Sequence, residues 1–309
     1  MGFDQLPIWA KKFNVQAHSP SGTARPTCLE FFDKAVARPR KWWTPANCAM
    51  QGGKAAEVFV RNVVVNGMDR SSAYREALAL YDEHVSPEHL PNDADKASMI
   101  RDGVYAIPRS KDEKDSGVIE QSGTVFELTC QHLLEGTLAA TAGANRVTDG
   151  RWCSLQLDGV DLDFIGEMDF EAGGVVETKT HWPFLAAETK NGFKINSLPA
   201  KPRPDHVVQV AFYRAWLQRQ EEHVPVNLVY ANCKGWRVFS SNDCEELSDL
   251  SLANALKRMR RVARHREKLM KTAESIEELL QLVVPEMGHF MWRDKPPEYL
   301  ELARRMFDD

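Results

Sequence analysis

The feature that most constrains the fold is a change of hydrophobic period in the middle of the chain. From Val160 to Phe170, apolar and polar residues alternate one by one, which is typical of a β-strand with one buried face. Gly173 and Gly174 then supply a turn, and Val175–Thr180 returns as a second strand. With a further strand predicted at 152–157, we expect a three-stranded meander at the centre of the protein.

Helical patterns lie on both sides of this meander. Before it, apolar spacing predicts helices at about 28–36, 54–65, 72–81 and 118–142, the second beginning after a glycine pair at 52–53. After it, we expect a helix at 205–220, strands at 224–231 and 236–239, a long helix or helix pair over 244–283 and a short helix after Pro297. This order predicts a mixed α/β fold, with a central sheet flanked by helices and a helical N-terminal half.

The same patterns suggest how the chain is organised. We expect a helical N-terminal region at 1–150 that forms a wall of the functional site, a core at 151–283 and a C-terminal tail at 284–309, all within one compact domain.

Composition narrows the class of protein. The 309 residues are 43% hydrophobic and 27% charged, which is typical of a globular chain. Neither a signal-peptide-like run at the start nor an apolar stretch of membrane-spanning length is present, so we expect a soluble, cytoplasmic protein without a membrane partner. The six cysteines lack the spacings of zinc or iron–sulfur sites. The sequence therefore predicts free thiols and no iron–sulfur cluster.

Positive charge is concentrated in two segments although the net charge is -5. Between Lys257 and Lys271, eight lysines and arginines accompany the single acid Glu267. Such a run forms either a solvated helix face or a phosphate-binding surface. In the second segment, Trp42 and Trp43 lie beside basic residues and either stack on bases of a single strand or pack in the core. The candidate DNA-binding residues in the two segments are Arg38, Arg40, Lys41, Trp42, Arg260, Arg261 and Arg264.

An acidic residue two positions before a lysine occurs three times, at Asp112/Lys114, Glu177/Lys179 and Glu188/Lys190. Only Glu177 follows an apolar β segment, a glycine turn and a strand that carries an aspartate, Asp169. The period of two places Glu177 and Lys179 on one face of their strand. Carboxylates grouped in this way bind hard divalent cations, and a nearby lysine can orient a water molecule and offset charge on a phosphate. A surface ion pair is the alternative for this pair taken alone.

A second pair of residues adds to this pattern on the next predicted helix. Gln209 and Tyr213 are four residues apart, so they share one helical face, which can point toward the end of the sheet.

The order Gly166-x-x-Asp169, Glu177-x-Lys179 and Gln209-x-x-x-Tyr213 resembles the G-x-x-D, (D/E)-x-K and Q-x-x-x-Y motifs of RecB-like nucleases. The chain is thus similar to the PD-(D/E)xK superfamily in its RecB-like exonuclease branch, and within it to the group of the mitochondrial genome-maintenance exonuclease and related phage exonucleases. The resemblance spans roughly residues 19–270. It departs from that group at Glu57, where histidine is common, and in lacking a proline before Asp169.

The resemblance implies a restriction-endonuclease-like αβββαβ core that binds Mg²⁺ or Mn²⁺ through Asp169, Glu177 and the backbone carbonyl of Thr178. Lys179 would serve the attacking water, while Gln209 and Tyr213 would steady Lys179 or touch the DNA. The implied activity is a metal-dependent DNA exonuclease. It would cut phosphodiester bonds by in-line attack of an activated water, leave 5′-phosphates, and act on DNA with a free end, either single-stranded or with a single-stranded tail.

Several alternatives stay open at this stage. Glu57 is a candidate third carboxylate, and Glu127 competes because it follows a glycine at the same spacing. Trp182 either lines the substrate path as a DNA contact or closes a loop. The activity could also be that of a structure-specific or restriction-type endonuclease of the same fold. A non-catalytic nucleic-acid-binding protein that uses the basic helix is a further possibility.

Overall fold

The protein is built around a five-stranded mixed sheet, seen in a computed structural model that describes residues 5–37, 39, 48–84, 125–182, 184–185, 193–194, 197–220, 223–292, 295 and 297–308. The strand order is β1-β4-β5-β8-β9, with β5 and β8 parallel and the other neighbours antiparallel. The strands are β1 (Thr148–Asp149), β4 (Phe170–Glu171), β5 (Val175–Thr180), β8 (Val226–Asn232) and β9 (Gly235–Ser240). The predicted mixed α/β class is confirmed.

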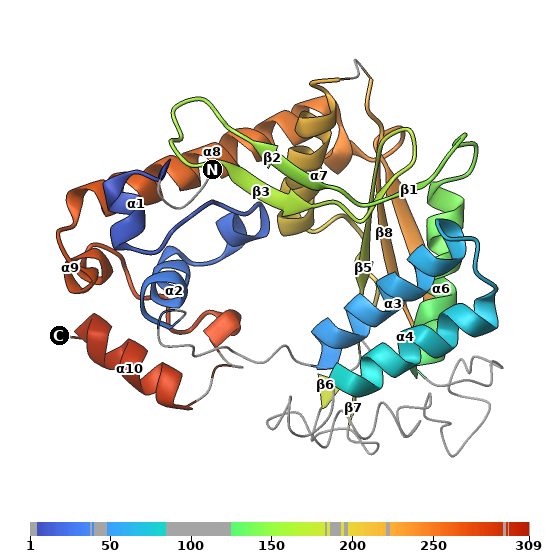
Figure 1. Ribbon diagram of the computed structural model, residues 1–309, viewed down its shortest axis with the longest axis horizontal. Coiled ribbons are helices and arrows are strands. Elements are labelled where there is room, and N and C mark those ends of the chain that lie inside the picture. Colours follow the sequence, from blue (N-terminus) through green and yellow to red (C-terminus); the bar gives the residue numbers. More distant parts are fainter. Residues whose placement is uncertain are drawn as a thin grey trace.

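Helices cover both faces of this sheet (Figure 1). On one face lie α3 (Cys48–Val64), α4 (Arg70–His84) and α6 (Val125–Ala140), and on the other lie α7 (Pro204–Leu217) and α8 (Asp249–Thr272). Strand β8 contributes side chains to the cores on both faces of the sheet, because Leu228 packs beneath α7 and Val229 packs beneath α6. The same alternation directs successive side chains of β5 to opposite layers.

The predicted strand over 160–170 is divided in the structure. Its first part, strand β3 (Phe164–Glu167), pairs antiparallel with β2 (Trp152–Leu155), whereas β4 joins the main sheet. The division falls at Met168 and Asp169, beside Gly150 of the neighbouring segment, where an added Cβ would lie 1.6 Å from the carbonyl oxygen of Met168. The two segments approach so closely here that the strand pairing is interrupted between the β2–β3 ribbon and the β1–β4 pair of the main sheet.

The N-terminal helices of the described residues pack with the C-terminal ones. A third core joins α1 (Ile8–Lys12), η2 (Ser21–Ala24), α2 (Thr27–Phe31) and η3 (Phe32–Ala37) to α9 (Ile276–Gln281), η6 (Phe290–Trp292) and α10 (Pro297–Asp308). Phe32 and Trp292 are among the fully buried side chains of this core. The helical N-terminal region that the sequence predicts is therefore shared between two cores.

The second predicted helix begins earlier than expected. Helix α3 starts at Cys48 and includes Gly52 and Gly53, rather than beginning after them. A Cβ at Gly52 would lie 2.8 Å from the Trp182 ring, and one at Gly53 would lie 3.0 Å from the Thr180 hydroxyl. The glycines thus allow α3 to approach the end of β5, and this close approach offsets their low helix propensity.

The remaining short elements are β6 (Phe184–Leu185), β7 (Phe193–Lys194) and η5 (Glu245–Leu247). Among the cysteines that the structure describes, five are free and four of these are buried, in agreement with the predicted free thiols. Within the described ranges, no helix has the length and apolar character needed to cross a bilayer.

Candidate active site

Asp169 lies where the sheet is interrupted. Strand β4 pairs with β5 only at Phe170 and Glu171, so the next part of β5 has no strand neighbour on that side among the described residues. There the Asp169 carboxylate takes the place of the missing strand: its Oδ2 accepts from the Thr178 amide at 2.7 Å and from the Thr178 hydroxyl at 2.7 Å. The carboxylate is therefore fixed beside the centre of β5.

Glu177 and Lys179 project from one face of β5, as the period of two predicts. Glu177 is 2% exposed, and Lys179 Nζ donates to its Oε1 at 2.5 Å. Burial and the nearby Asp169 raise the pKa of Glu177 to about 7, although Lys179 opposes this. Burial alone would lower the pKa of Lys179, but attraction to Glu177 and Asp169 outweighs it and raises the pKa.

The other oxygen of Glu177 is an exception among buried polar atoms. Its Oε2 is buried and has no hydrogen-bond partner in the part of the chain that the structure describes. An unsatisfied buried acceptor costs stability, so it marks a place where another group can bind.

Helix α3 brings a third carboxylate to this place. Burial and then Asp169 raise the pKa of Glu57 to about 8, with Glu177 adding to the shift and Arg61 opposing it. Arg61 Nη2 donates to Glu57 at 2.6 Å, and its Nε lies 2.5 Å from Asp149. The competing candidate Glu127 lies on α6, where Gln131 Nε2 donates to it at 3.4 Å. We call Glu57, Asp169, Glu177 and Lys179 the acidic cluster.

The Q-x-x-x-Y helix is α7, and its tyrosine has an unexpected partner. The Tyr213 hydroxyl donates to the Glu167 carbonyl at 2.6 Å, and a Cβ on Gly166 would lie 3.1 Å from the Tyr213 ring. Burial raises the pKa of Tyr213, and Glu177 and Asp169 add to this effect. Tyr213 thus holds the backbone two residues before Asp169 rather than reaching Lys179. Gln209 is half-buried one turn earlier.

Sequence reasoning missed His206, which lies three residues before Gln209 on the same helix. Its Nδ1 lies 2.8 Å from the hydroxyl of Tyr230, the residue that pairs with Lys179 across β5 and β8. Burial, and then the charge of Lys179, lower the pKa of His206 to about 3, so the ring is neutral. The helical spacing of 206, 209 and 213 was the signal that could have identified it.

The predicted DNA contacts have different outcomes. Arg38, Arg40, Lys41 and Trp42 lie outside the described residues. Trp182 is 4% exposed, stacks on Phe126 with ring centroids 6.0 Å apart, and donates from Nε1 to Thr180 Oγ1 at 2.8 Å. We correct its predicted role as a DNA contact, because a base has no free face of the ring to stack on.

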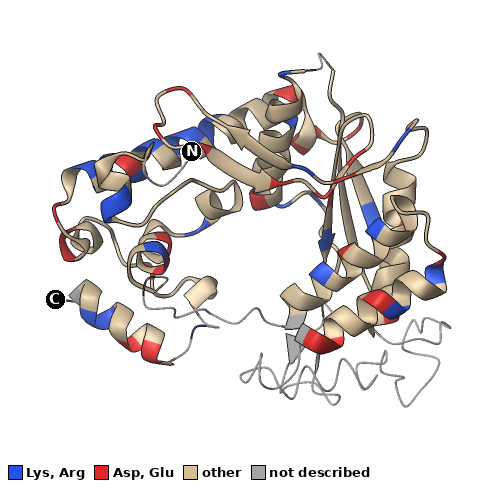
Figure 2. Ribbon diagram, viewed as in Figure 1, with Lys and Arg blue, Asp and Glu red and all other residues tan. Residues whose placement is uncertain are grey.

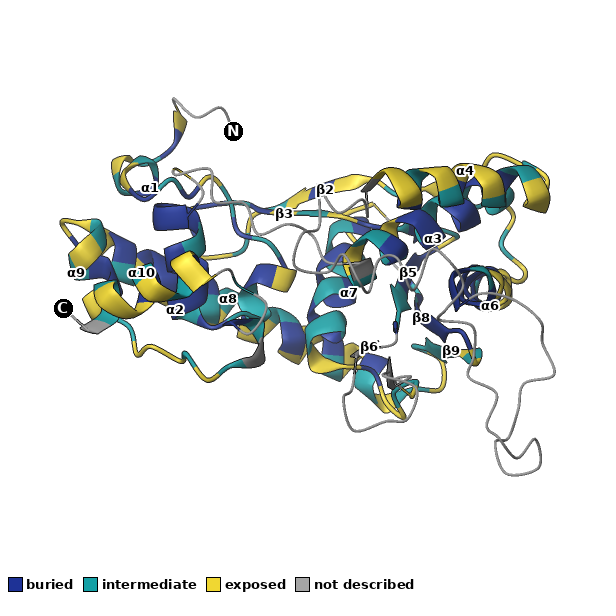
Figure 3. Ribbon diagram, turned by 90° about the horizontal axis from the view of Figure 1, so that it is seen from below, coloured by how far each residue is buried: buried dark blue, intermediate teal, exposed yellow. Residues whose placement is uncertain are grey.

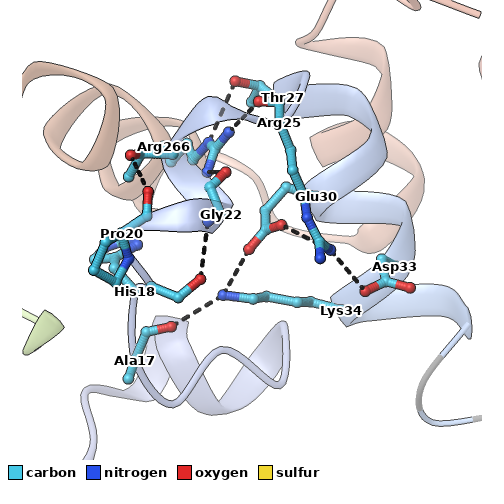
Figure 4. A network of polar contacts seen from close by, with 12 residues as sticks. Ala17, His18, Pro20, Gly22, Arg25, Thr27, Glu30, Asp33, Lys34 and Arg266 are labelled. Atoms are coloured by element: carbon cyan, nitrogen blue, oxygen red, sulfur yellow. Dashed lines mark hydrogen bonds and ion pairs between the residues drawn. The ribbon is translucent and has the colours of Figure 1, made fainter. Parts of the chain in front are cut away.

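The basic run forms part of α8, whose positive charge is visible in Figure 2. Arg261 and Arg264 are exposed and Arg260 is half-buried. Arg266 behaves differently: it is 2% exposed and donates to the Gly22 and Arg25 carbonyls at 2.9 and 2.7 Å (Figure 4). The run therefore has a structural side as well as an outward side.

The donor set of the acidic cluster suits a hard divalent cation, since it consists of carboxylate oxygens and a strand backbone. The unpartnered Glu177 Oε2 supports this fit. In the arrangement described, Lys179 occupies Glu177 Oε1 and Thr178 occupies Asp169 Oδ2. No three His, Cys, Asp or Glu side chains of the described segments already enclose a cation position. A cation would therefore bind together with a shift of Lys179 away from Glu177.

Comparison with known proteins adds little. No protein-family model and no curated protein matches the chain. A similar solved structure is that of a Eubacterium rectale protein provisionally described as an exonuclease, which is 11% identical with a TM-score of 0.41, over 96% of this chain and 93% of that chain. At this identity and score the likeness does not bear on the assignment, which depends on the sequence motifs and the acidic cluster.

Proposed function

We propose that the protein is a metal-dependent DNA exonuclease of the PD-(D/E)xK superfamily, in its RecB-like branch. The observation that carries the proposal is the acidic cluster, in which a buried glutamate has an unpartnered oxygen beside two further carboxylates and a lysine. The motif order in the sequence supports the same class, since each of its motifs contributes a residue to this part of the fold.

Asp169, Glu177, Glu57 and the backbone carbonyl of Thr178 would hold Mg²⁺ or Mn²⁺. The bound cation would supply neutralisation of the phosphoryl oxygens and an acidified water molecule. Burial and then the charge of Asp169 raise the pKa values of Glu57 and Glu177, and a bound cation would offset both effects.

The chain's own residues have distinct tasks in this proposal. Lys179, cationic at neutral pH, orients the attacking water and offsets charge that develops on the phosphate. Tyr213 and Gly166 keep the backbone before Asp169 in place, and Thr178 fixes the Asp169 carboxylate. Phe126 and Trp182 pack in the apolar core on the other face of β5. Hydrolysis in line with the leaving oxygen would leave a 5′-phosphate.

The test is to incubate the purified protein with end-labelled linear DNA and with closed circular DNA, in Mg²⁺, in Mn²⁺ and in EDTA. We expect products from linear DNA in either cation and none in EDTA. Cutting of closed circles would identify an endonuclease of the same fold. Binding without cleavage in either cation would identify a non-catalytic DNA-binding protein and refute the enzymatic proposal.

A matched pair of variants assigns any cleavage to this cluster. Glu177→Gln should abolish cleavage, whereas Glu188→Ala, which alters the other acid of the same Glu-x-Lys spacing, should leave it intact. Glu188 lies outside the described residues, so this control depends on the sequence alone. The reverse result would move the site to the second pair.

A further inference from the structure

Arg61 lies between two carboxylates at the edge of the acidic cluster. It follows Glu57 by one helical turn on α3, which packs against α4 and β5 (Figure 3). Its Nη2 donates to Glu57 Oε1 at 2.6 Å, and its Nε lies 2.5 Å from Asp149 Oδ1. Asp149 pairs across the sheet with Phe170, the residue after Asp169. The guanidinium of Arg61 therefore bridges α3 and β1 beside the acidic cluster.

Most donors of this guanidinium are still available. A guanidinium carries several N–H donors, and in the part of the chain that the structure describes, that of Arg61 makes one hydrogen bond, to Glu57. Its Nε is buried and close to Asp149, but it makes no hydrogen bond of ordinary geometry with the described residues. The side chain is 25% exposed, so a ligand can reach it. Arg61 can therefore accept a further partner.

Glu57 is the carboxylate that Arg61 and a divalent cation would share. Positive charge bound at Glu57 would weaken the bond that now holds Arg61 Nη2, because two cations would compete for one carboxylate. The contact with Asp149 would keep the guanidinium in place, since Asp149 Oδ1 is itself held by the Gly150 amide at 2.9 Å. The Nη1 and Nη2 atoms would then be the available side of Arg61.

The charges of the site indicate that an anion binds there. Among the described residues that these contacts connect, four carboxylates face two basic side chains: Glu57, Asp149, Asp169 and Glu177 against Lys179 and Arg61. A dication would bring these charges close to balance, so that a phosphate could enter. Without Arg61 the phosphate would meet an excess of negative charge. A guanidinium also fits phosphate geometrically, because two of its N–H groups reach two oxygens.

We propose that Arg61 binds the phosphate of the bond that is cut when Glu57 is engaged by a divalent cation. The inference rests on the proposed nuclease function and adds a substrate-binding residue that lies outside the sequence motifs. Without a cation, Glu57 and Asp149 hold Arg61. With a cation, Nη1 and Nη2 turn from Glu57 to two phosphate oxygens while Asp149 keeps its contact with Nε. Cation and DNA therefore bind cooperatively, and this residue couples them.

The first test measures cation binding without DNA, by isothermal titration calorimetry with Mg²⁺. Because Arg61 competes with the cation for Glu57, Arg61→Gln should bind Mg²⁺ about tenfold more tightly than wild type. Arg61→Lys keeps the charge and should stay close to wild type. The matched control is Arg75→Gln, on the exposed side of α4, which should leave Mg²⁺ affinity unchanged. Equal or weaker Mg²⁺ binding in Arg61→Gln would mean that Arg61 holds the site together, and it would overturn the proposal.

The second test measures DNA affinity by fluorescence anisotropy, in Mg²⁺ and in EDTA. The oligonucleotides carry phosphorothioate linkages, which slow cleavage. In Mg²⁺, Arg61→Gln should bind DNA about tenfold more weakly than wild type, because charge-assisted bonds to a phosphate are lost. In EDTA, where Glu57 holds the guanidinium, the two proteins should agree within about twofold. Arg61→Lys, which loses the paired N–H groups, should show a smaller loss in Mg²⁺. An equal loss in both buffers would overturn the proposal.

The two proposals fail in different ways. Cation-dependent DNA binding through Arg61, without cleavage of unmodified DNA, would keep the phosphate contact and refute the nuclease. Cleavage of DNA with no Mg²⁺-specific loss of affinity in Arg61→Gln would keep the nuclease and refute the phosphate contact. Absence of Mg²⁺ binding in the wild-type protein would overturn both. Melting temperatures in EDTA identify a variant that is not folded, and Arg61→Lys then replaces Arg61→Gln in the DNA comparison.

Discussion

Two groups of buried charges in this protein differ in how completely they are paired. In the first, the acidic cluster, the pKa values of Glu57 and Glu177 rise to about 8 and about 7. In the second, near the N-terminus, Glu30 is also buried, but Lys34, Arg266 and Arg25 outweigh burial and lower its pKa. Lys34 Nζ lies 2.9 Å from Glu30, and the surrounding contacts are drawn in Figure 4.

Glu267 completes the second group, which we call the buried ion network together with His18, Glu30, Lys34 and Arg266. The Glu267 carboxylate accepts from the backbone amides of Asp161 and Leu162 at 2.9 Å each, and His18 Nε2 lies 3.2 Å from it. The network joins α8 to the N-terminal segment and to the residues that precede β3. Its charges are satisfied within the chain, whereas those of the acidic cluster are not, which is the expected difference between structural and functional charges.

The largest effect that distinguishes the acidic cluster from the buried ion network is expected at Glu177. Glu177→Gln should lower cleavage by about 1000-fold, because charge stabilisation at the reacting phosphate is lost. The free energy of unfolding should not fall, since the variant removes a buried carboxyl with an unpartnered oxygen. Cleavage assays and urea denaturation of the same preparation measure both quantities. A variant that loses activity only in proportion to lost folded protein would show that Glu177 is structural.

The converse is expected at Glu267. Glu267→Ala removes the acceptor of two buried backbone amides and the partner of His18, so it should cost about 3–5 kcal/mol of stability. Urea denaturation measures the loss, and Glu277→Ala on the exposed side of α9 is the control, with a change within about 0.5 kcal/mol. A loss below about 1 kcal/mol would mean that the network does not fasten α8.

The sequence predicts the positions of Asp169, Glu177 and Lys179 because their signals are local. Alternation, a glycine turn and the spacing of Glu177 and Lys179 are properties of one hairpin, and they predict a shared face without knowledge of the rest. The break at Gly150 was not predictable in this way, since it arises from the carbonyl of Met168 on another strand.

Long-range packing accounts for the other differences. Of the two roles that the sequence allows for Trp182, lining the substrate path is wrong, because the nearness of α3 and α6 makes it a core residue. Arg266 is one of several arginines on a basic helix, and only the N-terminal segment packed against it makes it structural. Helical spacing alone could not separate Glu57 from Glu127, because it does not say which helix reaches β5.

The third prediction concerns whether Glu57 binds the cation. Glu57→Gln should raise the Mg²⁺ concentration for half-maximal cleavage about tenfold, because one anionic oxygen near the cation is lost. Glu127→Gln, on α6, should leave this concentration unchanged. The measurement is a Mg²⁺ titration of cleavage rate at saturating DNA. A shift in the Glu127 variant alone would transfer the ligand to α6, and unchanged values in both would confine cation binding to the hairpin.

The pH dependence of stability should also separate the two groups. In EDTA, the folded state retains protons on Glu57 and Glu177 that the unfolded chain releases near the usual pKa of 4.5. Their contribution to stability is complete below that pH and is lost as pH rises through about 7 and 8. Melting temperature should therefore fall between pH 5.5 and 8.5, and less so in Glu177→Gln. Glu30, whose pKa is lowered, contributes above pH 4.5, so Glu30→Gln should keep the neutral-range slope.

The smallest effect concerns the outward side of α8, where the same helix carries both kinds of charge. Neutralising Arg260, Arg261 and Arg264 to Gln should reduce the salt dependence of DNA affinity, since each lost phosphate contact releases about 0.7–0.9 fewer counterions. Stability should hardly change, because two of these side chains are exposed and the third is half-buried. Arg266→Gln should do the opposite: it removes bonds to the Gly22 and Arg25 carbonyls and destabilises the fold, with the salt slope unchanged. Affinity measured from low to high salt in each variant decides between these outcomes, and an unaltered slope in the triple variant would make the outward arginines a solvated face.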